Sequence, residues 1–249
     1  MNNLISHSSP NWNERPVGTI IDTVVIHYTG MKTGQAALDR LCDPIAEVSA
    51  HYLIEEDGRV FQLVAEEKRA WHAGVSHWRG RNNLNHNSIG IELVNPGHEF
   101  GYKAFPDAQI TALLQLLEEI HQRHNISPAN IIGHSDIAFD RKTDPGELFP
   151  WKLLYQKGFG LFSHKECEDN TPILQSGDEG SAVEEMHSLL KLIGYNVTES
   201  ACFDKMSEDA LVAFQAHWRQ TAVTGVYDQG TKNTLQDIAE QIARCEDLT

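Results

Sequence analysis

The chain lacks several features that would each indicate a particular class of protein. No apolar run approaches the ~20 residues that a transmembrane helix needs, so no membrane span is expected. Lys and Arg number 20 against 35 Asp and Glu, which gives a formal net charge of −15. This balance argues against nucleic-acid binding, because phosphate recognition requires clustered cations. The four cysteines form no CxxC pair, which excludes a metal knuckle or a thioredoxin-like motif.

The N-terminal stretch MNNLIS (residues 1–6) has neither the basic segment nor the apolar core of a secretory signal. The absence of a secretory signal favours a cytoplasmic location. In such a reducing compartment Cys42, Cys167, Cys202 and Cys245 are expected to be structural or free thiols.

Strands and helices are mixed along the first part of the chain. An Asp-Gly pair within residues 56–58 predicts a hairpin between two strand-like runs. Residues 106–124 show apolar positions at helical spacing, which predicts a helix with one buried face. The predicted strands are 19–27, 49–55, 59–64, 88–94 and 130–133, and the predicted helices are 34–42, 106–124 and 149–155. This pattern indicates an α/β domain with a mixed β-sheet flanked by helices.

The composition changes after residue 162. Residues 163–177 are polar and contain no convincing element, so they are interpreted as a linker. Three helical stretches follow, at 180–193, 207–219 and 231–243. They predict a small all-α three-helix domain with no acid-base or metal constellation, and therefore a binding module. The expected division is a catalytic domain over 1–162, a linker over 163–177 and the small domain over 178–249.

Chemistry is concentrated in the segment IGHSDI (residues 132–137) and in RKTDPG (141–146) just after it. Together they carry His134, Lys142 and Asp144, and a second histidine, His27, stands far upstream at a strand end. Two histidines and one carboxylate, with a fourth position left to water, form the ligand set of a catalytic zinc.

A zinc hydrolase also needs a base for the water and a cation or donor for the oxyanion. Glu92 lies in an apolar strand, where a carboxylate is costly unless it has a function or a partner. Lys142 is placed to supply the cation. Spacing alone leaves other interpretations open: His27 as a structural residue, Asp144 as a turn former and Lys142 as a solvated charge.

The chain resembles the zinc-dependent N-acetylmuramoyl-L-alanine amidases of the AmpD and AmiD type, which share their fold with peptidoglycan recognition proteins. The matching segments occur in order across about residues 19–155. They are VIHYT (25–29), SAHYLI (49–54), RAWHAGVS (69–76), NSIGIE (87–92), GHSDIA (133–138) and RKTDPG (141–146).

The resemblance implies one zinc ion per chain, held by His27, His134 and Asp144, with Glu92 as general base and Lys142 stabilising the oxyanion. Asp144 stands where some relatives carry cysteine, and His86 stands where close relatives often carry an acidic residue. The implied reaction cleaves the amide between N-acetylmuramic (or 1,6-anhydro-N-acetylmuramic) acid and L-alanine of the stem peptide. The implied substrate-groove residues, with supporting roles for the two histidines, are His51, Trp71, His72, Arg79, Arg81 and Asn83.

The C-terminal stretch resembles three-helix peptidoglycan-binding modules, so the expected partners are peptidoglycan or muropeptides. The matching features are GDEGSAV (177–183), LIGY (192–195), FD (203–204), AFQ (213–215) and TGVYD (224–228). Such a module favours contact with the cell envelope, so the compartment stays open. A monomer is expected. The alternatives are a non-catalytic peptidoglycan receptor on the same fold and a zinc peptidase or deacetylase acting on another bond of the polymer.

Overall fold

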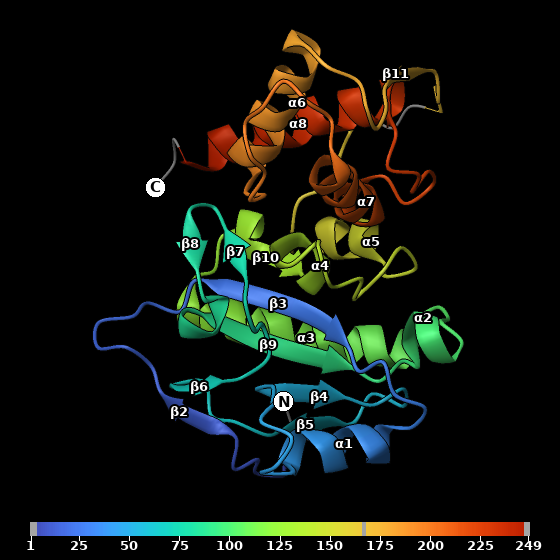
Figure 1. Ribbon diagram of the computed structural model, residues 1–249. Helices are drawn as coiled ribbons and strands as arrows, with labels where there is room; N and C mark the ends of the chain where they lie inside the picture. The colour runs from blue at the N-terminus through green and yellow to red at the C-terminus, as the bar shows by residue number, and fades with distance from the viewer. Residues whose placement is uncertain (1–3, 166–167, 247–249) are drawn as a thin grey trace.

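The structure, a computed structural model, describes residues 4–165 and 168–246. A central sheet has helices on both faces, and a helical C-terminal part lies against one end of it (Figure 1). The strands are β1 (Leu4–Ser6), β2 (Trp12–Glu14), β3 (Thr23–Tyr28), β4 (Tyr52–Ile54), β5 (Val60–Gln62), β6 (Lys68–Ala70), β7 (His77–Trp78), β8 (Arg81–Asn82), β9 (Ser88–Leu93), β10 (Ile131–Gly133), β11 (Pro172–Leu174) and β12 (Tyr227–Asp228). The α-helices are α1 (Gly34–Cys42), α2 (Gly97–Phe100), α3 (Asp107–His124), α4 (His134–Ile137), α5 (Trp151–Gln156), α6 (Ser181–Ile193), α7 (Lys205–Trp218) and α8 (Gln229–Glu246), and the 3-10 helices are η1 (Leu84–His86) and η2 (Pro128–Asn130).

The main sheet is mixed, as predicted, with the strand order β1-β5-β4-β9-β3-β10. Only the β4–β5 pair is antiparallel among its described pairings. This is the hairpin expected from the Asp-Gly pair, and Gly58 takes the positive φ of 87° that its turn requires. The strands β9, β3 and β10 run parallel side by side, so their carboxyl ends share one edge of the sheet.

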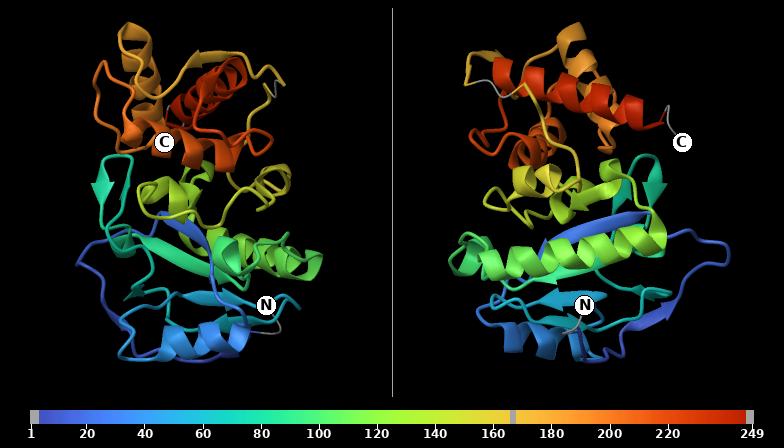
Figure 2. Two further views of the ribbon diagram at one scale, coloured as in Figure 1. Left: turned by 45° about the vertical axis from the view of Figure 1, so that its right-hand side comes forward. Right: turned by 180° about the vertical axis from the view of Figure 1, so that it is seen from behind.

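Alternating side chains of the sheet are buried on opposite faces. Tyr52 and Ile54 pack in one cluster with the apolar face of α3, whereas Leu53, between them, packs with α1. The right-hand view of Figure 2 shows α3 lying across the sheet. The helix ends where Asn125 adopts a left-handed conformation (φ 49°) and donates its N–H to the His121 carbonyl.

The C-terminal part (residues 178–246) contains the three predicted helices. The preceding stretch differs from prediction, because residues expected to hold no element form β11, which pairs with β12. The two strands lie more than 50 residues apart in the chain, and a local pattern carries no signal for such a partner.

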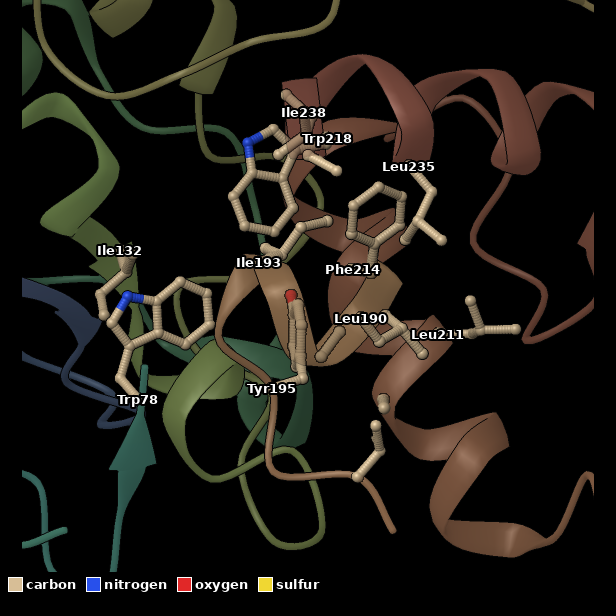
Figure 3. Packing of buried hydrophobic residues seen from close by; sticks show 14 of the residues in the cluster. Trp78, Ile132, Leu190, Ile193, Tyr195, Leu211, Phe214, Trp218, Leu235 and Ile238 are labelled. Atoms are coloured by element: carbon tan, nitrogen blue, oxygen red, sulfur yellow. The ribbon is translucent and has the colours of Figure 1, made fainter. Parts of the chain in front are cut away.

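The C-terminal part and the N-terminal part (residues 4–162) share a hydrophobic core. Trp78 of β7 and Ile132 of β10 lie beside Ile193 and Tyr195 of the C-terminal part (Figure 3). The rings of Trp78 and Tyr195 meet edge to face, with centroids 5.4 Å apart. The helices are therefore packed directly onto the sheet domain.

Within residues 4–165 and 168–246, no helix combines the length and apolar character needed to span a bilayer. Cys42, Cys202 and Cys245 are free thiols, as expected. Cys167 lies outside the described residues.

Candidate active site

Two parallel strands bring a histidine and a glutamate to the same place. In the β3–β9 ladder the Cα atom of His27 is paired with that of Glu92. Val24 and Ile26 of β3 belong to the cluster beneath α3, so His27 points to the opposite face by alternation. Glu92 alternates with Ile91 in the same way and shares that face. Register alone therefore places the two side chains next to each other, near the carboxyl edge of the sheet.

The remaining predicted ligands arrive at this edge from the loop after β10. His134 begins α4 directly after β10, and the backbone N–H of Ser135 donates to the Asp144 carbonyl at 2.8 Å, which fixes the returning loop. The Nδ1 atoms of His27 and His134 lie 3.0 Å apart, and each lies 3.0 Å from Oδ2 of Asp144. All three residues are buried.

These three atoms have the chemistry and spacing of a metal site. Zinc–nitrogen bonds of ~2.0–2.1 Å require ligand atoms about this close together. The Nε2–H of His134 donates to the Ala73 carbonyl at 3.2 Å, which leaves Nδ1 with its lone pair free for an ion. Among the described residues, His27, His134 and Asp144 form the one His/Cys/Asp/Glu cluster compatible with a metal ion.

The protonation states at the site also suit a cation. Burial, together with the nearby His134, lowers the pKa of His27 to about 4, so its ring is neutral near pH 7. Burial opposes ionisation of Asp144, but its close contacts with His134 and His27 outweigh that effect and hold its pKa well below the usual range. The neutral imidazole of His27 and the carboxylate of Asp144 therefore face one point, with Nδ1 of His134 beside them.

One carboxylate oxygen of Glu92 is left without a partner. Its Oε2 atom is buried and makes no hydrogen bond within the described part of the chain. Burial, and next the negative charge of Asp144, raise the pKa of Glu92 well above its usual value, while Lys142 acts in the opposite direction. Such an orphaned carboxylate indicates a group that handles a proton rather than one that stabilises the fold.

A cavity of about 570 Å³ opens over these groups. Its walls include Trp71 and His72, which were expected in a substrate groove, as well as Lys142 and Glu92. It also contains residues that the sequence did not single out: Tyr28, Met31, Arg40, Arg141 and Thr143. Arg141 and Thr143 flank Lys142 and could have been found from that neighbourhood, whereas Arg40 reaches the cavity from α1 and carried no local signal.

His51 was expected near the site in a supporting role, and the structure places it beneath the cavity. The residue is 0% exposed. Its Nδ1 accepts the backbone N–H of Gly90 at 3.0 Å, and its Nε2 lies 3.1 Å from the Lys68 carbonyl and 3.0 Å from the Arg15 guanidinium. Both nitrogens are thus occupied within the protein, and His51 supports the sheet beneath the site.

Arg79, Arg81 and Asn83 do not line the cavity over His27, His134 and Asp144. Arg79 and Arg81 line a separate cavity of about 600 Å³, together with residues of α6 and α8. Arg81 forms an ion pair with Asp22, before the start of β3 and thus at the end opposite His27. Asn83 is exposed and left-handed, with φ 56°. The hairpin β7–β8 carries these residues away because Trp78 packs against Tyr195.

Comparison with known proteins agrees with this arrangement. The sequence profile described as "N-acetylmuramoyl-L-alanine amidase" matches residues 17–147, and that described as "Putative peptidoglycan binding domain" matches residues 179–235. The N-acetylmuramoyl-L-alanine amidase AmiD of Escherichia coli is 36% identical over 241 residues, covering 89% of this chain and 83% of AmiD. The 1,6-anhydro-N-acetylmuramyl-L-alanine amidase AmpD of Haemophilus influenzae is 38% identical over 162 residues, covering 58% of this chain and 86% of AmpD.

A solved structure extends the match to the fold. The complex of E. coli AmiD with the substrate anhydro-N-acetylmuramic acid-L-Ala-D-gamma-Glu-L-Lys superimposes with a TM-score of 0.79 at 34% identity, covering 92% of this chain and 93% of AmiD. The profile match, the similarity to AmiD over most of both chains and the shared fold show that this chain belongs to the N-acetylmuramoyl-L-alanine amidase family and is an amidase of peptidoglycan.

Proposed function

We propose that this amidase hydrolyses the bond between the lactyl carbonyl of N-acetylmuramic, or 1,6-anhydro-N-acetylmuramic, acid and the amine of L-alanine, in cell-wall turnover or recycling. The substrate named in the AmiD complex contains this bond. The AmpD relative is named for the anhydro form. The single observation that carries the proposal is the meeting of His27, His134 and Asp144 beside an unpartnered Glu92.

One zinc ion, held by His27, His134 and Asp144, is the proposed cofactor. The fit rests on three buried ligand atoms 3.0 Å apart, which are Nδ1 of each histidine and Oδ2 of Asp144. Zinc in such a site supplies Lewis acidity and lowers the pKa of bound water to about 7. The mixed nitrogen and oxygen donors, with no thiolate, are those of catalytic zinc sites.

Glu92 is the proposed general base. Its carboxylate removes a proton from the attacking water, whose oxygen bonds to the lactyl carbonyl carbon. When the C–N bond breaks, the carboxylate passes that proton to the departing amine of L-alanine, so the products are the sugar acid and the free peptide. A bound cation favours the ionised carboxylate against the burial that raises its pKa. Lys142, on the cavity wall, faces the negative charge that develops on the scissile carbonyl oxygen.

Substrate recognition is proposed for the cavity walls around the metal ligands. Arg40, Arg141 and Lys142 line the cavity and match the carboxylates of a stem peptide. Trp71 offers an indole whose Nε1–H donates to Asn13 at 3.1 Å, which orients the ring beside the cavity. We also propose that residues 178–249 form a domain that binds peptidoglycan, joined through the linker 163–177, with the chain acting as a monomer.

The test is Glu92→Gln, assayed by mass spectrometry on a soluble 1,6-anhydro-muropeptide. We expect kcat to fall by about 10²–10⁴ while zinc remains bound, because the change removes the base and keeps the ligands. Glu118→Gln, an exposed residue of α3 on the other face of the sheet, is the matched control and is expected to retain activity.

Near-wild-type turnover by Glu92→Gln would overturn the assignment of the base. A chelator is expected to abolish activity and added zinc to restore it. Products other than an intact peptide with a free L-alanine amine would favour a peptidase or deacetylase. Metal binding without turnover would favour a receptor.

A further inference from the structure

The nitrogens that face away from the metal site on both histidine ligands contact two successive residues. Nε2 of His27 lies 3.0 Å from Nδ1 of His72, and Nε2 of His134 lies 3.2 Å from the carbonyl oxygen of Ala73. A histidine binds a metal only through an unprotonated nitrogen, so each ring must carry its proton on Nε2 for Nδ1 to serve as ligand. A carbonyl oxygen only accepts, which settles the tautomer of His134.

For His27 the tautomer depends on a chain of three groups. The hydroxyl of Ser88 donates its one proton to the Leu84 carbonyl at 2.5 Å. Nε2 of His72 lies 3.1 Å from the same hydroxyl oxygen, which then has only lone pairs to offer. His72 must therefore carry its proton on Nε2 and present a bare Nδ1. That nitrogen accepts the Nε2–H of His27.

The opposite arrangement, in which the Ser88 hydroxyl donates to Nε2 of His72, is unfavourable. If the Ser88 hydroxyl donated to His72, two oxygen atoms, those of Ser88 and Leu84, would face each other at 2.5 Å with no proton between them. His72 would then carry its proton on Nδ1, and His27 would turn its own proton towards Asp144 and His134. An N–H at that position blocks a metal ion.

The loop that carries these groups is anchored. Oδ1 of Asn85 accepts the backbone N–H groups of His72 at 3.1 Å and Ala73 at 2.8 Å. Space for the imidazole comes from Gly90 of β9, because a Cβ atom there would lie 2.4 Å from Cγ of His72. The absence of a side chain at residue 90 thus lets the ring of His72 lie behind His27.

We propose that residues 72 and 73 are positioning residues that set both metal-binding histidines in the Nδ1-presenting tautomer, with Ser88 selecting the tautomer of His72. His72 thus acts through His27. The inference rests on the proposed function in that His27 and His134 are the ligands. The tautomers, however, are properties of the metal-free protein and can be measured without any metal.

The first experiment is a long-range ¹H–¹⁵N spectrum of the histidine rings in metal-free wild-type protein at a mildly alkaline pH. We expect Nε2–H for His27, His72 and His134. An Nδ1–H tautomer on His27 or His72 would overturn the proposal without any variant having to fold. Failure of the wild type to bind zinc would instead overturn the proposed function, so the two failures are distinguishable.

The second experiment measures the zinc dissociation constant of Ser88→Ala by competition with a chelator. We expect it to rise about 10–100-fold, the usual effect of losing an outer partner of a metal ligand. In the same variant the metal-free spectrum should show a mixture of His27 tautomers. Ser88→Thr keeps the hydroxyl and is expected to restore both readouts.

Ser9→Ala is the matched control. Ser9 is also buried, donates to a backbone carbonyl (Leu41, 2.6 Å) and accepts a backbone N–H (Asn11, 3.2 Å), but its hydroxyl makes no hydrogen bond to a histidine in the described part of the chain. The zinc dissociation constant of the Ser9→Ala protein is expected to equal that of wild type. An unchanged dissociation constant in Ser88→Ala, or an equal change in Ser9→Ala, would contradict the proposal.

Discussion

Glu92 and Glu66 show how the partners of a glutamate decide its role. Glu92 has a buried oxygen without a hydrogen bond in the described chain, and burial raises its pKa well above the usual range. Burial acts in the same direction on Glu66, but hydrogen bonds from Arg123, His124 and Tyr52 outweigh it and lower its pKa to about 2. Glu66 is therefore held as a carboxylate that joins α3 to β4, whereas Glu92 is left available for chemistry.

The Glu66 cluster predicts a pH dependence of stability. Its folded-state pKa is about 2 against 4.5 for an unperturbed glutamate, so its contribution is full above pH ~4.5 and disappears as the pH falls towards 2. At pH 7 we expect Glu66→Gln to reduce the free energy of unfolding by about 1–3 kcal/mol, the range for hydrogen bonds to a charged group. The difference from wild type should shrink on acidification through that window. Urea titrations at several pH values measure it.

Glu118→Gln serves as the control here too, because Glu118 is exposed and its side chain accepts only from Gln122 in the described structure, at 2.8 Å. It is expected to leave the pH profile of stability unchanged. A Glu66→Gln protein whose deficit stayed constant from pH 7 down to pH 2 would refute the assignment of Glu66 as a depressed carboxylate.

At the scale of elements, strong periodicity predicted the structure well. The helix expected over 106–124 is α3 (Asp107–His124), and the predicted apolar positions Ile110, Leu113, Leu117 and Ile120 are buried. Leu114 is only partly buried, because it lies at the margin of the helix face. The strand expected over 19–27 is shorter at its start, since residues before Thr23 have no ladder partner among the described strands.

Leu113 lies at the centre of the face that α3 presents to the sheet, and it is 0% exposed. Leu113→Ala is expected to lower the free energy of unfolding by about 2–5 kcal/mol, through lost apolar contact and the cavity left behind. Thr111→Ala, exposed on the same helix, should change it by less than ~0.5 kcal/mol. Chemical denaturation of both variants is the measurement, and similar losses would show that α3 does not carry the core.

The whole molecule is held together by a buried polar network as well as by apolar packing. Asp136, two residues after His134, accepts the hydroxyl of Tyr195 at 2.6 Å, the backbone N–H of Gly133 at 2.7 Å and Nδ1–H of His217 at 2.7 Å. The His217 ring also stacks on Trp151, with centroids 3.7 Å apart. The turn that delivers His134 is thus braced by the C-terminal part.

Tyr195→Phe removes one donor to Asp136 and leaves the aromatic packing in place. We expect the free energy of unfolding to fall by about 1–3 kcal/mol, because a buried charged acceptor loses a hydrogen bond. Tyr227→Phe, at another buried tyrosine of the C-terminal part, is the control and should cost less. Thermal denaturation compares the two, and equal melting temperatures would argue that the junction is held by apolar contacts alone.

The sequence by itself determined the mixed sheet and the three C-terminal helices, because periodicity and turn chemistry are local properties. The candidate ligands His27, His134 and Asp144 came from the family resemblance, and the structure brings them together. Only the tertiary structure decided which polar groups meet. It buried His51, separated Arg79 and Arg81 from the three candidate ligands, and placed His72 behind His27. Those outcomes depend on register and on packing between distant segments, and no local pattern records either.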